Sequence, residues 1–439
     1  MKKTKRIAGV SLLMAILGGC IFLERMMPII TGYAAKNLAS AVFVSGREAE
    51  AVEALDLNFS MIRYTNNTVD YDNKTVTSRF LWGKSTAVYR EGYGVTLLRG
   101  ASVDDLRKQP YPLSTDTATT GLLPRGDSAV SARQAPIAKA FVDDHAYHGH
   151  PFAFVVLHKG GVVAERYDKG IGPHTKLLCW SVTKSFVNAL VGIMVKDSLV
   201  DIHTPMPVAE WQGDGRKAIT LHDLMQMQSG LAWNEDYGAR SDVNVMLHCE
   251  QDMGLYALNK PLEYEPGTHW CYSSGTTNIV VRYLRSLFGS DREFLDYMRE
   301  RLFVPLGIHG AVFEQDMSGT PVGSSYLFAT AMDFARFGQL YIDDGCIGDE
   351  RILPESWIAY TCTPASDSRG RYGASFWLNK SHKFTDVPED MYWCDGHDGQ
   401  YIYIIPSAQL VVVILSYSPK PDNVIDQNTL LKDVINQIY

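Results

Sequence analysis

The sequence predicts an α+β fold in which one antiparallel sheet is flanked by helices and carries a helical subdomain. Apolar, strand-like runs occur on both sides of a helical stretch, at 152–157, 162–167, 391–394, 401–405 and 410–415. Helix-like and loop-like segments dominate 201–310 between them. Strands separated in this way are expected to pair in one mostly antiparallel sheet, and a crevice between sheet and helical insertion is a natural place for a site.

Length and composition limit the possible classes of protein. The 439 residues are enough for about three domains, and a content of 46% hydrophobic residues can build a large core. The net charge is −8 and no basic stripe is present, which argues against a nucleic-acid partner. We divide the chain into three regions, at 1–33, 34–135 and 136–439.

The N-terminal region, 1–33, predicts an export signal or a membrane anchor. Four basic residues in the first six precede an apolar run at 7–23. The run Leu17-Gly18-Gly19-Cys20 also resembles a bacterial lipoprotein processing site, in which Cys20 would be lipidated. An uncleaved anchor and a lipoprotein both remain open. In either case the rest of the chain is expected to be exported, facing the periplasm from the bacterial inner membrane or attached as a lipoprotein.

Residues 34–135 are expected to form a leader region whose role the sequence does not give. Strand-like runs occur at 87–89 and 94–98. The stretch 114–126 is rich in Thr, Ser, Asp and Gly and predicts a linker or a long loop. No chemical motif is apparent in this region.

From residue 138 onward the predicted elements are better defined. A turn at Lys159-Gly160-Gly161 joins the strands at 152–157 and 162–167 into a hairpin. Helices are predicted at 187–195, 329–341, 354–360 and 424–438.

Seven cysteines are present, and six remain if Cys20 is lipidated. An exported protein can form disulfides, and Cys346 and Cys362, which bracket a loop and a short helix, are a plausible pair. Cysteines near the motifs described next are expected to pack as small buried apolar side chains. These are Cys179, Cys271 and Cys394.

Ser181 is the only serine that is followed three residues later by a lysine, Lys184. The pair opens a predicted helix, and residues three apart lie on the same helix face. A lysine partly shielded from water can lose its proton and become the base that activates a serine hydroxyl. This is the Ser-x-x-Lys arrangement of active-site serine acyl hydrolases, with Ser181 as nucleophile and Lys184 as its base.

A second candidate segment, at 265–275, combines a Pro-Gly turn with an aromatic-rich loop that leads into a helix. Tyr272 in this loop is a candidate proton carrier. A tyrosine beside a lysine ammonium is expected to have a lowered pKa and to exchange protons with a serine or a leaving group.

The third candidate segment is Asp395-Gly396-His397-Asp398-Gly399-Gln400, which enters an apolar strand. We expect His397 and Gly399 to share one face of that strand, so that a substrate acyl group can lie close to the backbone at Gly399. The backbone N–H groups of Gln400 and Ser181 would then form an oxyanion hole. The alternative is a glycine-rich β-turn with an exposed histidine.

Together the three segments resemble the serine β-lactamase and penicillin-binding protein superfamily. More narrowly they resemble its class C-type esterase and amide-hydrolase branch, which includes 6-aminohexanoate-dimer hydrolase. The resemblance covers about 138 to the C-terminus and extends to 219–231, 329–338, 351–354 and 375–379.

This resemblance implies a β-lactamase/DD-peptidase-like fold and a role for each matched residue. Ser181 is implied to be the acylated nucleophile and Lys184 its base partner. Tyr272 and Ser274 are implied to be the first and third positions of a Tyr-x-Asn/Ser motif. The run His397-Asp398-Gly399 takes the place of a Lys-Thr-Gly motif.

Two departures from the family pattern bear on the substrate. Ser274 stands where many penicillin-recognising members carry an amide side chain, and His397 and Asp398 replace the lysine and threonine that help to hold a carboxylate. A neutral histidine beside an acid holds an anion less well. Recognition of β-lactams or D-alanyl-D-alanine is therefore in doubt, and an ester or an uncharged amide is favoured.

The sequence thus predicts a serine hydrolase that cleaves a small ester or amide through an acyl-enzyme on Ser181. Neither a metal nor a cofactor is expected, because no zinc motif such as His-Glu-x-x-His and no phosphate-binding glycine-rich loop is present. The alternatives are a DD-peptidase or class C-type β-lactamase and, in another class, a non-catalytic penicillin-binding-like envelope protein.

Overall fold

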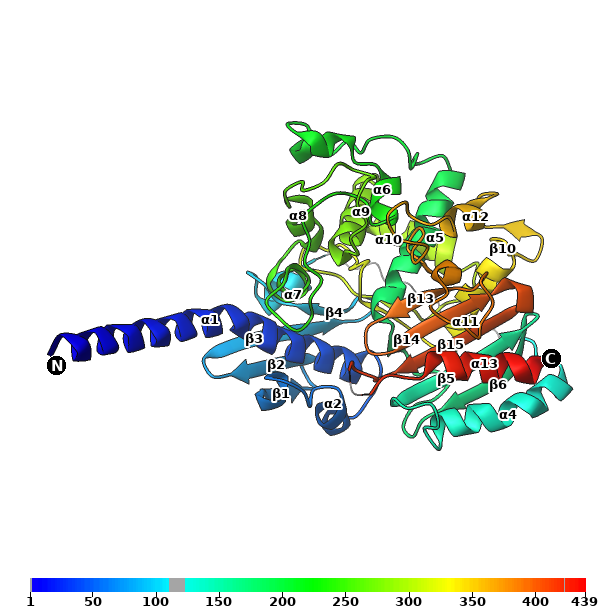
Figure 1. Ribbon diagram of the computed structural model, residues 1–439, viewed down its shortest axis with the longest axis horizontal. Coiled ribbons are helices and arrows are strands. Elements are labelled where there is room, and N and C mark those ends of the chain that lie inside the picture. The colour runs from blue at the N-terminus through cyan, green and yellow to red at the C-terminus, as the bar shows by residue number, and fades with distance from the viewer. Residues whose placement is uncertain (1, 110–122, 422) are drawn as a thin grey trace.

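The computed structural model describes residues 2–109, 123–421 and 423–439, with side chains from residue 18 onward. Its largest sheet has six antiparallel strands in the order β12-β13-β14-β15-β5-β6 (Figure 1). The strands are Trp377–Leu378, Tyr392–Gly396, Gln400–Ile405, Leu410–Ser416, Pro151–His158 and Gly161–Tyr167. C-terminal β15 pairs with N-terminal β5, so strands from both ends of this region meet at the sheet centre. The predicted α+β class is confirmed.

Helices cover both faces of the main sheet. Alternate residues of β5 point to opposite faces, as the period of a strand requires. Phe154 and Val156 pack in one core with α4 (Ser128–Val142) and α13 (Gln427–Ile438). Val155 and Leu157 pack in a second core with α5 (Thr183–Lys196) and α11 (Ala331–Ile342). Burial on both faces explains why β5 and β15 are continuously apolar.

A helical subdomain lies beside the sheet and provides one side of the site. Its helices are α6 (Leu221–Met225), α7 (Asp242–Cys249), α8 (Met253–Leu258), α9 (Ser274–Ser286) and α10 (Asp291–Met298). Four of them begin after a serine or aspartate whose side chain accepts a backbone N–H, which ends the preceding loop at a defined residue. A small sheet in the order β7-β9-β8, made of Leu177–Leu178, Leu327–Ala329 and Val312–Phe313, connects this subdomain to the α5 region.

Four further elements of the fold are short. They are β10 (Cys346–Ile347), β11 (Glu350–Arg351), α12 (Trp357–Thr361) and, in the N-terminal region, α3 (Val103–Arg107). Each of the seven cysteines is free, so the expected pairing of Cys346 with Cys362 is wrong.

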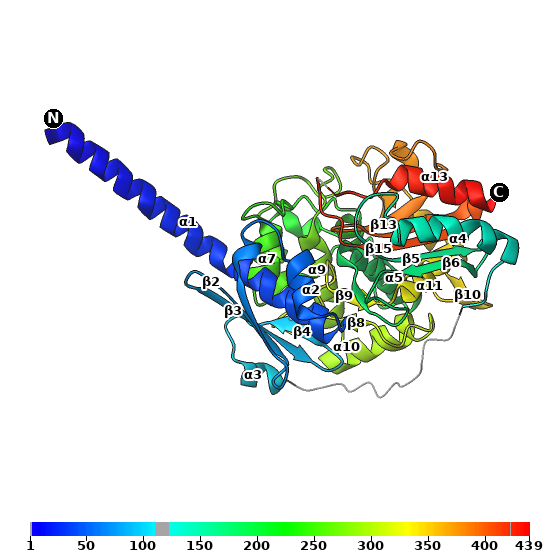
Figure 2. The same cartoon turned by 90° about the horizontal axis from the view of Figure 1, so that it is seen from below.

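The N-terminal region folds as a unit of its own. Helix α1 (Lys2–Phe43) packs along a four-stranded antiparallel sheet, and its first half projects from the body of the molecule (Figures 1 and 2). The sheet consists of β1 (Asn66–Asp70), β2 (Thr75–Phe80), β3 (Gly83–Arg90) and β4 (Gly94–Leu97), and α2 (Ala49–Leu55) follows α1. The strand-like runs at 87–89 and 94–98 lie in β3 and at β4. Most of the predicted linker at 114–126 lies outside the described residues.

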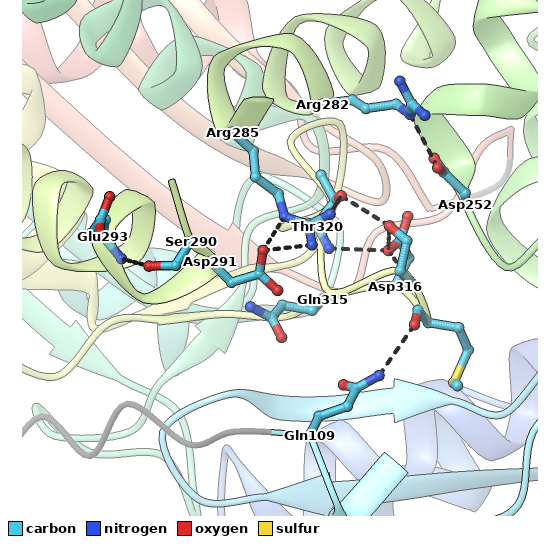
Figure 3. A network of polar contacts seen from close by, with 12 residues as sticks. Gln109, Asp252, Arg282, Arg285, Ser290, Asp291, Glu293, Gln315, Asp316 and Thr320 are labelled. Carbon is cyan, nitrogen blue, oxygen red and sulfur yellow. Dashed lines mark hydrogen bonds and ion pairs between the residues drawn. The ribbon is translucent and has the colours of Figure 1, made fainter. Parts of the chain in front are cut away.

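Buried polar contacts join this unit to the rest of the chain. Lys36 of α1 and Glu314, which follows β8, form a buried ion pair, and Ser40 donates to the same carboxylate. The backbone N–H of Val95 in β4 donates to Glu314 at 2.7 Å. A network around the buried Asp316 lies beside it, where Gln109 contacts the backbone of Met317 (Figure 3). A buried carboxylate must be paired or hydrogen-bonded, so these contacts fix the N-terminal unit in one place.

The apolar run at 7–23, on which the anchor prediction depends, lies mostly within the residues whose side chains are not described. Among the residues that could be searched, no helix combines the length and the apolar character needed to cross a bilayer. Cys20 is an exposed free thiol on α1.

Candidate active site

Ser181 lies in a 3₁₀ turn, Trp180–Val182, that leads directly into α5. The residue before it, Trp180, has a φ of 47°, a left-handed conformation that is uncommon for a bulky side chain. Lys184 is in the first turn of α5, on the same face as Ser181. The Lys184 Nζ atom lies 2.8 Å from the Ser181 Oγ atom, so the predicted pair is brought into hydrogen-bond contact.

The surroundings of Lys184 suit a base. Its amine also contacts the Ser274 Oγ atom at 3.0 Å and the Ser324 carbonyl oxygen at 2.9 Å. The side chain is buried, and burial lowers the pKa of Lys184 to about 8, against the opposing effect of the Glu235 carboxylate. A neutral amine can donate to the Ser274 and Ser324 oxygens and keep its lone pair for the Ser181 proton.

Tyr272 lies next to this pair. Its ring centroid is 5.0 Å from the Lys184 Nζ atom. Burial, Tyr372 and Glu235 raise the pKa of Tyr272 well above its ordinary value, and the neighbouring Ser181 opposes them only in part. The lowered pKa expected from the sequence is therefore wrong in direction, because desolvation outweighs the nearby amine. Tyr272 is a protonated phenol that can donate a hydrogen bond.

Glu235 is part of the site although sequence reasoning missed it. Its carboxylate accepts hydrogen bonds from the Ser274 backbone N–H at 2.9 Å and from the Ser274 hydroxyl at 2.5 Å. It also accepts from Trp233 and from the Tyr237 hydroxyl, the latter at 3.1 Å. Glu235 thus orients Ser274, which in turn contacts Lys184. The segment carries no periodic pattern, and its only sequence signal is an acid between two aromatic residues.

His397 reaches the same site from the main sheet. Its ring stacks on Tyr237 with centroids 4.6 Å apart and contacts Trp180 edge-on at 5.6 Å. Its Nε2 atom lies 3.3 Å from the Asp398 Oδ1 atom. The histidine is therefore adjacent to Trp180, the residue that precedes the candidate nucleophile.

The His397-Asp398-Gly399 run is a turn between β13 and β14 and is not part of a strand face. The run is therefore a turn, as the alternative held, but its histidine is partly buried and packs on Tyr237 and Trp180. Gly399 has a φ of 95°, and a Cβ atom there would lie 2.2 Å from the Ser416 hydroxyl. Glycine is required at this position for the turn and for close packing on β15, which corrects the expectation that it makes room for a substrate.

Asp398 is directed toward a small cavity of about 60 Å³ under α1. The cavity is lined in part by Tyr33, Arg47 and Asp56 of the N-terminal unit. Burial raises the pKa of Asp398, and the neighbouring His397 opposes that effect. Gln400 begins β14, and its side-chain amide donates to the carbonyl oxygens of Ser416 and His397. The oxyanion-hole roles of the Gln400 and Ser181 N–H groups stay predictions.

Two of the nearby cysteines pack beneath the site. Cys179 and Cys394 are buried, and burial raises the pKa of the Cys179 thiol to about 12. No cluster of three or more His, Cys, Asp or Glu residues that could hold a metal ion occurs in the searched part of the structure.

Comparison with known proteins agrees with this geometry. The family model described as Beta-lactamase matches residues 137–435. The chain is 25% identical over 300 residues to a 6-aminohexanoate-dimer hydrolase from Paenarthrobacter ureafaciens, a match that covers 62% of this chain and 73% of that protein. It is also 28% identical over 195 residues to a D-aminopeptidase from Brucella ovis, covering 40% of this chain and 36% of the relative.

A solved structure of a family VIII carboxylesterase is similar in fold, with a TM-score of 0.56 and 17% identity. The match covers 72% of this chain and 99% of the carboxylesterase. The N-terminal unit, with α1 and its four-stranded sheet, lies outside the region that the family model matches.

Proposed function

The chain belongs to the beta-lactamase family and is a hydrolase, and from that premise we propose that it cleaves an ester or amide bond through an acyl-enzyme on Ser181. The observation that carries the proposal is the contact of 2.8 Å between the Lys184 Nζ and Ser181 Oγ atoms, with the amine buried. A serine needs a base within this distance to become a nucleophile at neutral pH.

In the proposed acylation step, Lys184 takes the proton of Ser181 while the Ser181 oxygen attacks the substrate carbonyl carbon. The tetrahedral intermediate collapses, the bond to the leaving alcohol or amine breaks, and the leaving group takes up a proton. The protonated Tyr272, which lies beside Ser181 and Lys184, is suited to donate that proton, and Lys184 can reprotonate it. Water then attacks the ester of Ser181, which releases a carboxylate and restores the serine hydroxyl.

The proposed substrate is an uncharged ester or amide. His397 and Asp398 stand where the family pattern carries lysine and threonine, so the site has no permanent cation at the position of the motif lysine. The two curated relatives are named for amide substrates, which supports an amide, whereas the carboxylesterase shares only the fold.

Labelling with a fluorophosphonate tests the nucleophile. We expect mass spectrometry to place the adduct on Ser181, and Ser181→Ala to lose several orders of magnitude in kcat. An adduct on another serine would contradict the assignment. The same protein should be assayed on p-nitrophenyl esters, linear amides and nitrocefin. Turnover of nitrocefin above that of the esters would favour the β-lactamase or DD-peptidase alternative. Failure of every probe to label Ser181 would favour a non-catalytic envelope protein.

We further propose that the protein is exported by a bacterium and that its N-terminus attaches it to the membrane. The basic residues and the apolar run at 7–23 support this, and α1 projects from the body with Ile21 and Phe22 exposed (Figure 1). We expect the full chain to sediment with membranes and a chain beginning at Met26, which keeps the buried part of α1, to stay in solution. Cys20→Ala tests lipidation. If the unmodified protein incorporates labelled lipid and the Cys20→Ala protein does not, the chain is a lipoprotein. If neither protein incorporates labelled lipid and both sediment with membranes, the N-terminus is an anchor.

A further inference from the structure

A second cavity, of about 310 Å³, lies where the N-terminal sheet meets the hydrolase domain. None of its lining residues belongs to the Ser181 site. The end of β3 and the turn between β3 and β4 form one wall, and the chain from the end of α10 to β8 forms the other. A volume of this size at a junction between two folded units is typical of small-molecule sites.

The walls of this cavity are mixed, with apolar and aromatic side chains beside charged ones. Six of the side chains that line it are Tyr89, Tyr93, Leu295, Met298, Phe303 and Phe313. The segment Arg299–Phe303 continues α10 as a π-helical turn, and Arg299 and Phe303 both line the cavity. Such turns are rare and often occur at functional sites.

One cation that lines the cavity lacks a close counter-ion. Lys176 lies across Gly310, so that a Cβ atom added to the glycine would be 3.8 Å from the lysine Nζ atom. Within the described residues Lys176 has no carboxylate at ion-pair distance. Burial lowers the pKa of Lys176, and the more distant Asp333 carboxylate opposes that effect. His309 also lines the cavity, and three other charged groups there are paired or exposed. Asp296 pairs with Arg292, Arg299 pairs with Glu300, and Glu91 is solvent-exposed in the hairpin turn.

From these contacts we propose that the cavity is a second ligand site, which binds a small monocarboxylate with an apolar or aromatic body. The carboxylate pairs with Lys176, and the apolar body fills the space between the two walls. A multiply charged anion is disfavoured, because Glu91 and Asp296 also line the cavity. Lys176 directly precedes β7, the strand that leads to Ser181, but binding at this site does not depend on the proposed hydrolysis.

Calorimetric titration of the full chain tests the site, with benzoate and hexanoate as probes and benzamide as the uncharged control. Before titration Ser181 is blocked with a fluorophosphonate, so that the catalytic site does not contribute. We expect both carboxylates to bind and benzamide to bind about tenfold more weakly, the value of one charge-assisted contact.

Substitutions locate the binding. Lys176→Met should lower the affinity for benzoate about tenfold, and Lys176→Arg should retain it. Ala311 lines the cavity, so Ala311→Phe should fill the space and prevent benzoate from binding. Lys169→Met changes an exposed lysine that does not line the cavity and should have no effect. The proposal would be overturned if neither carboxylate bound to the unmodified protein. It would also be overturned if the folded Lys176→Met and Ala311→Phe proteins bound benzoate as tightly as the unmodified protein.

Discussion

Tyr33 of helix α1 stacks on Trp180, the residue before Ser181, with ring centroids 6.4 Å apart and planes at 20°. Trp180 also contacts Tyr326 and His397 and has a φ of 47°. An uncommon backbone conformation persists only where its surroundings hold it in place. A side chain from outside the family-matched region therefore helps to hold the turn that carries the candidate nucleophile.

We predict that Tyr33→Ala slows acylation. An aromatic pair contributes about 0.5–1.5 kcal/mol, so the rate of labelling of Ser181 should fall by up to about tenfold while KM changes little. Tyr33→Phe should keep the normal rate, because the stack needs only the ring. Phe59→Ala is the matched control, since Phe59 packs on Tyr33 but does not take part in the stack on Trp180. If folded Tyr33→Ala protein is labelled at the normal rate, Tyr33 does not position the site.

The buried amine of Lys184 predicts a pH dependence. Its pKa is lowered to about 8, and only the neutral form can accept the Ser181 proton. The acylation rate should therefore rise with pH up to about 8 and level off above it. The Glu235 charge raises the pKa of Lys184, so Glu235→Gln should move this rise to lower pH. Stopped-flow acylation between pH 5 and pH 10 measures the effect.

Glu210→Gln, a change at an exposed residue, is the control for the shift in the pH profile. A shift of the profile to higher pH in Glu235→Gln, or no shift at all, would show that Lys184 is not the titrating base.

His397 predicts the substrate preference. We expect kcat/KM for short-chain esters to exceed that for nitrocefin by orders of magnitude, because His397 stands where the family pattern carries a permanently charged lysine. His397→Lys should improve nitrocefin hydrolysis about five- to tenfold, the value of one partly solvated charge contact. Asp398 is directed into the cavity under α1, so adding Asp398→Thr should change little more. Efficient hydrolysis of nitrocefin by the unmodified protein would contradict this prediction.

Structural features that depend on local sequence patterns could be predicted. Strands β5, β6, β13, β14 and β15 follow from apolar runs, and the Ser181–Lys184 contact follows from a spacing of three residues where a helix begins. Contacts between segments far apart in the chain could not be predicted in this way. Glu235 meets Ser274 through a loop without periodicity, and the direction of the Tyr272 pKa shift depends on how deeply tertiary packing buries the phenol.

Most of the fold of the N-terminal unit could not be predicted from local sequence patterns either. Only β3 and β4 left a signal in the sequence, because β1 and β2 are rich in polar residues and partly exposed. Its docking depends on single buried polar pairs such as Lys36 with Glu314, which have no sequence signature.

Asp316 belongs to the network where the N-terminal unit meets the helical subdomain (Figure 3). Its carboxylate accepts from the Met253 backbone N–H at 2.9 Å and from the Ser318 hydroxyl at 2.7 Å. Burial nevertheless raises the pKa of Asp316 from 3.8 to about 6. The folded state therefore holds this proton more tightly than the unfolded state does.

This raised pKa predicts that protonation of Asp316 stabilises the fold. The contribution should be fully present below about pH 4 and lost as the pH rises to about 6, with a size of up to about 3 kcal/mol. Asp316→Asn cannot titrate, so its free energy of unfolding should change less with pH over this range than that of the unmodified protein. Urea unfolding at several pH values measures the difference, with Asp349→Asn as the exposed control. If Asp316→Asn and the unmodified protein show parallel pH dependence, Asp316 does not titrate in this range.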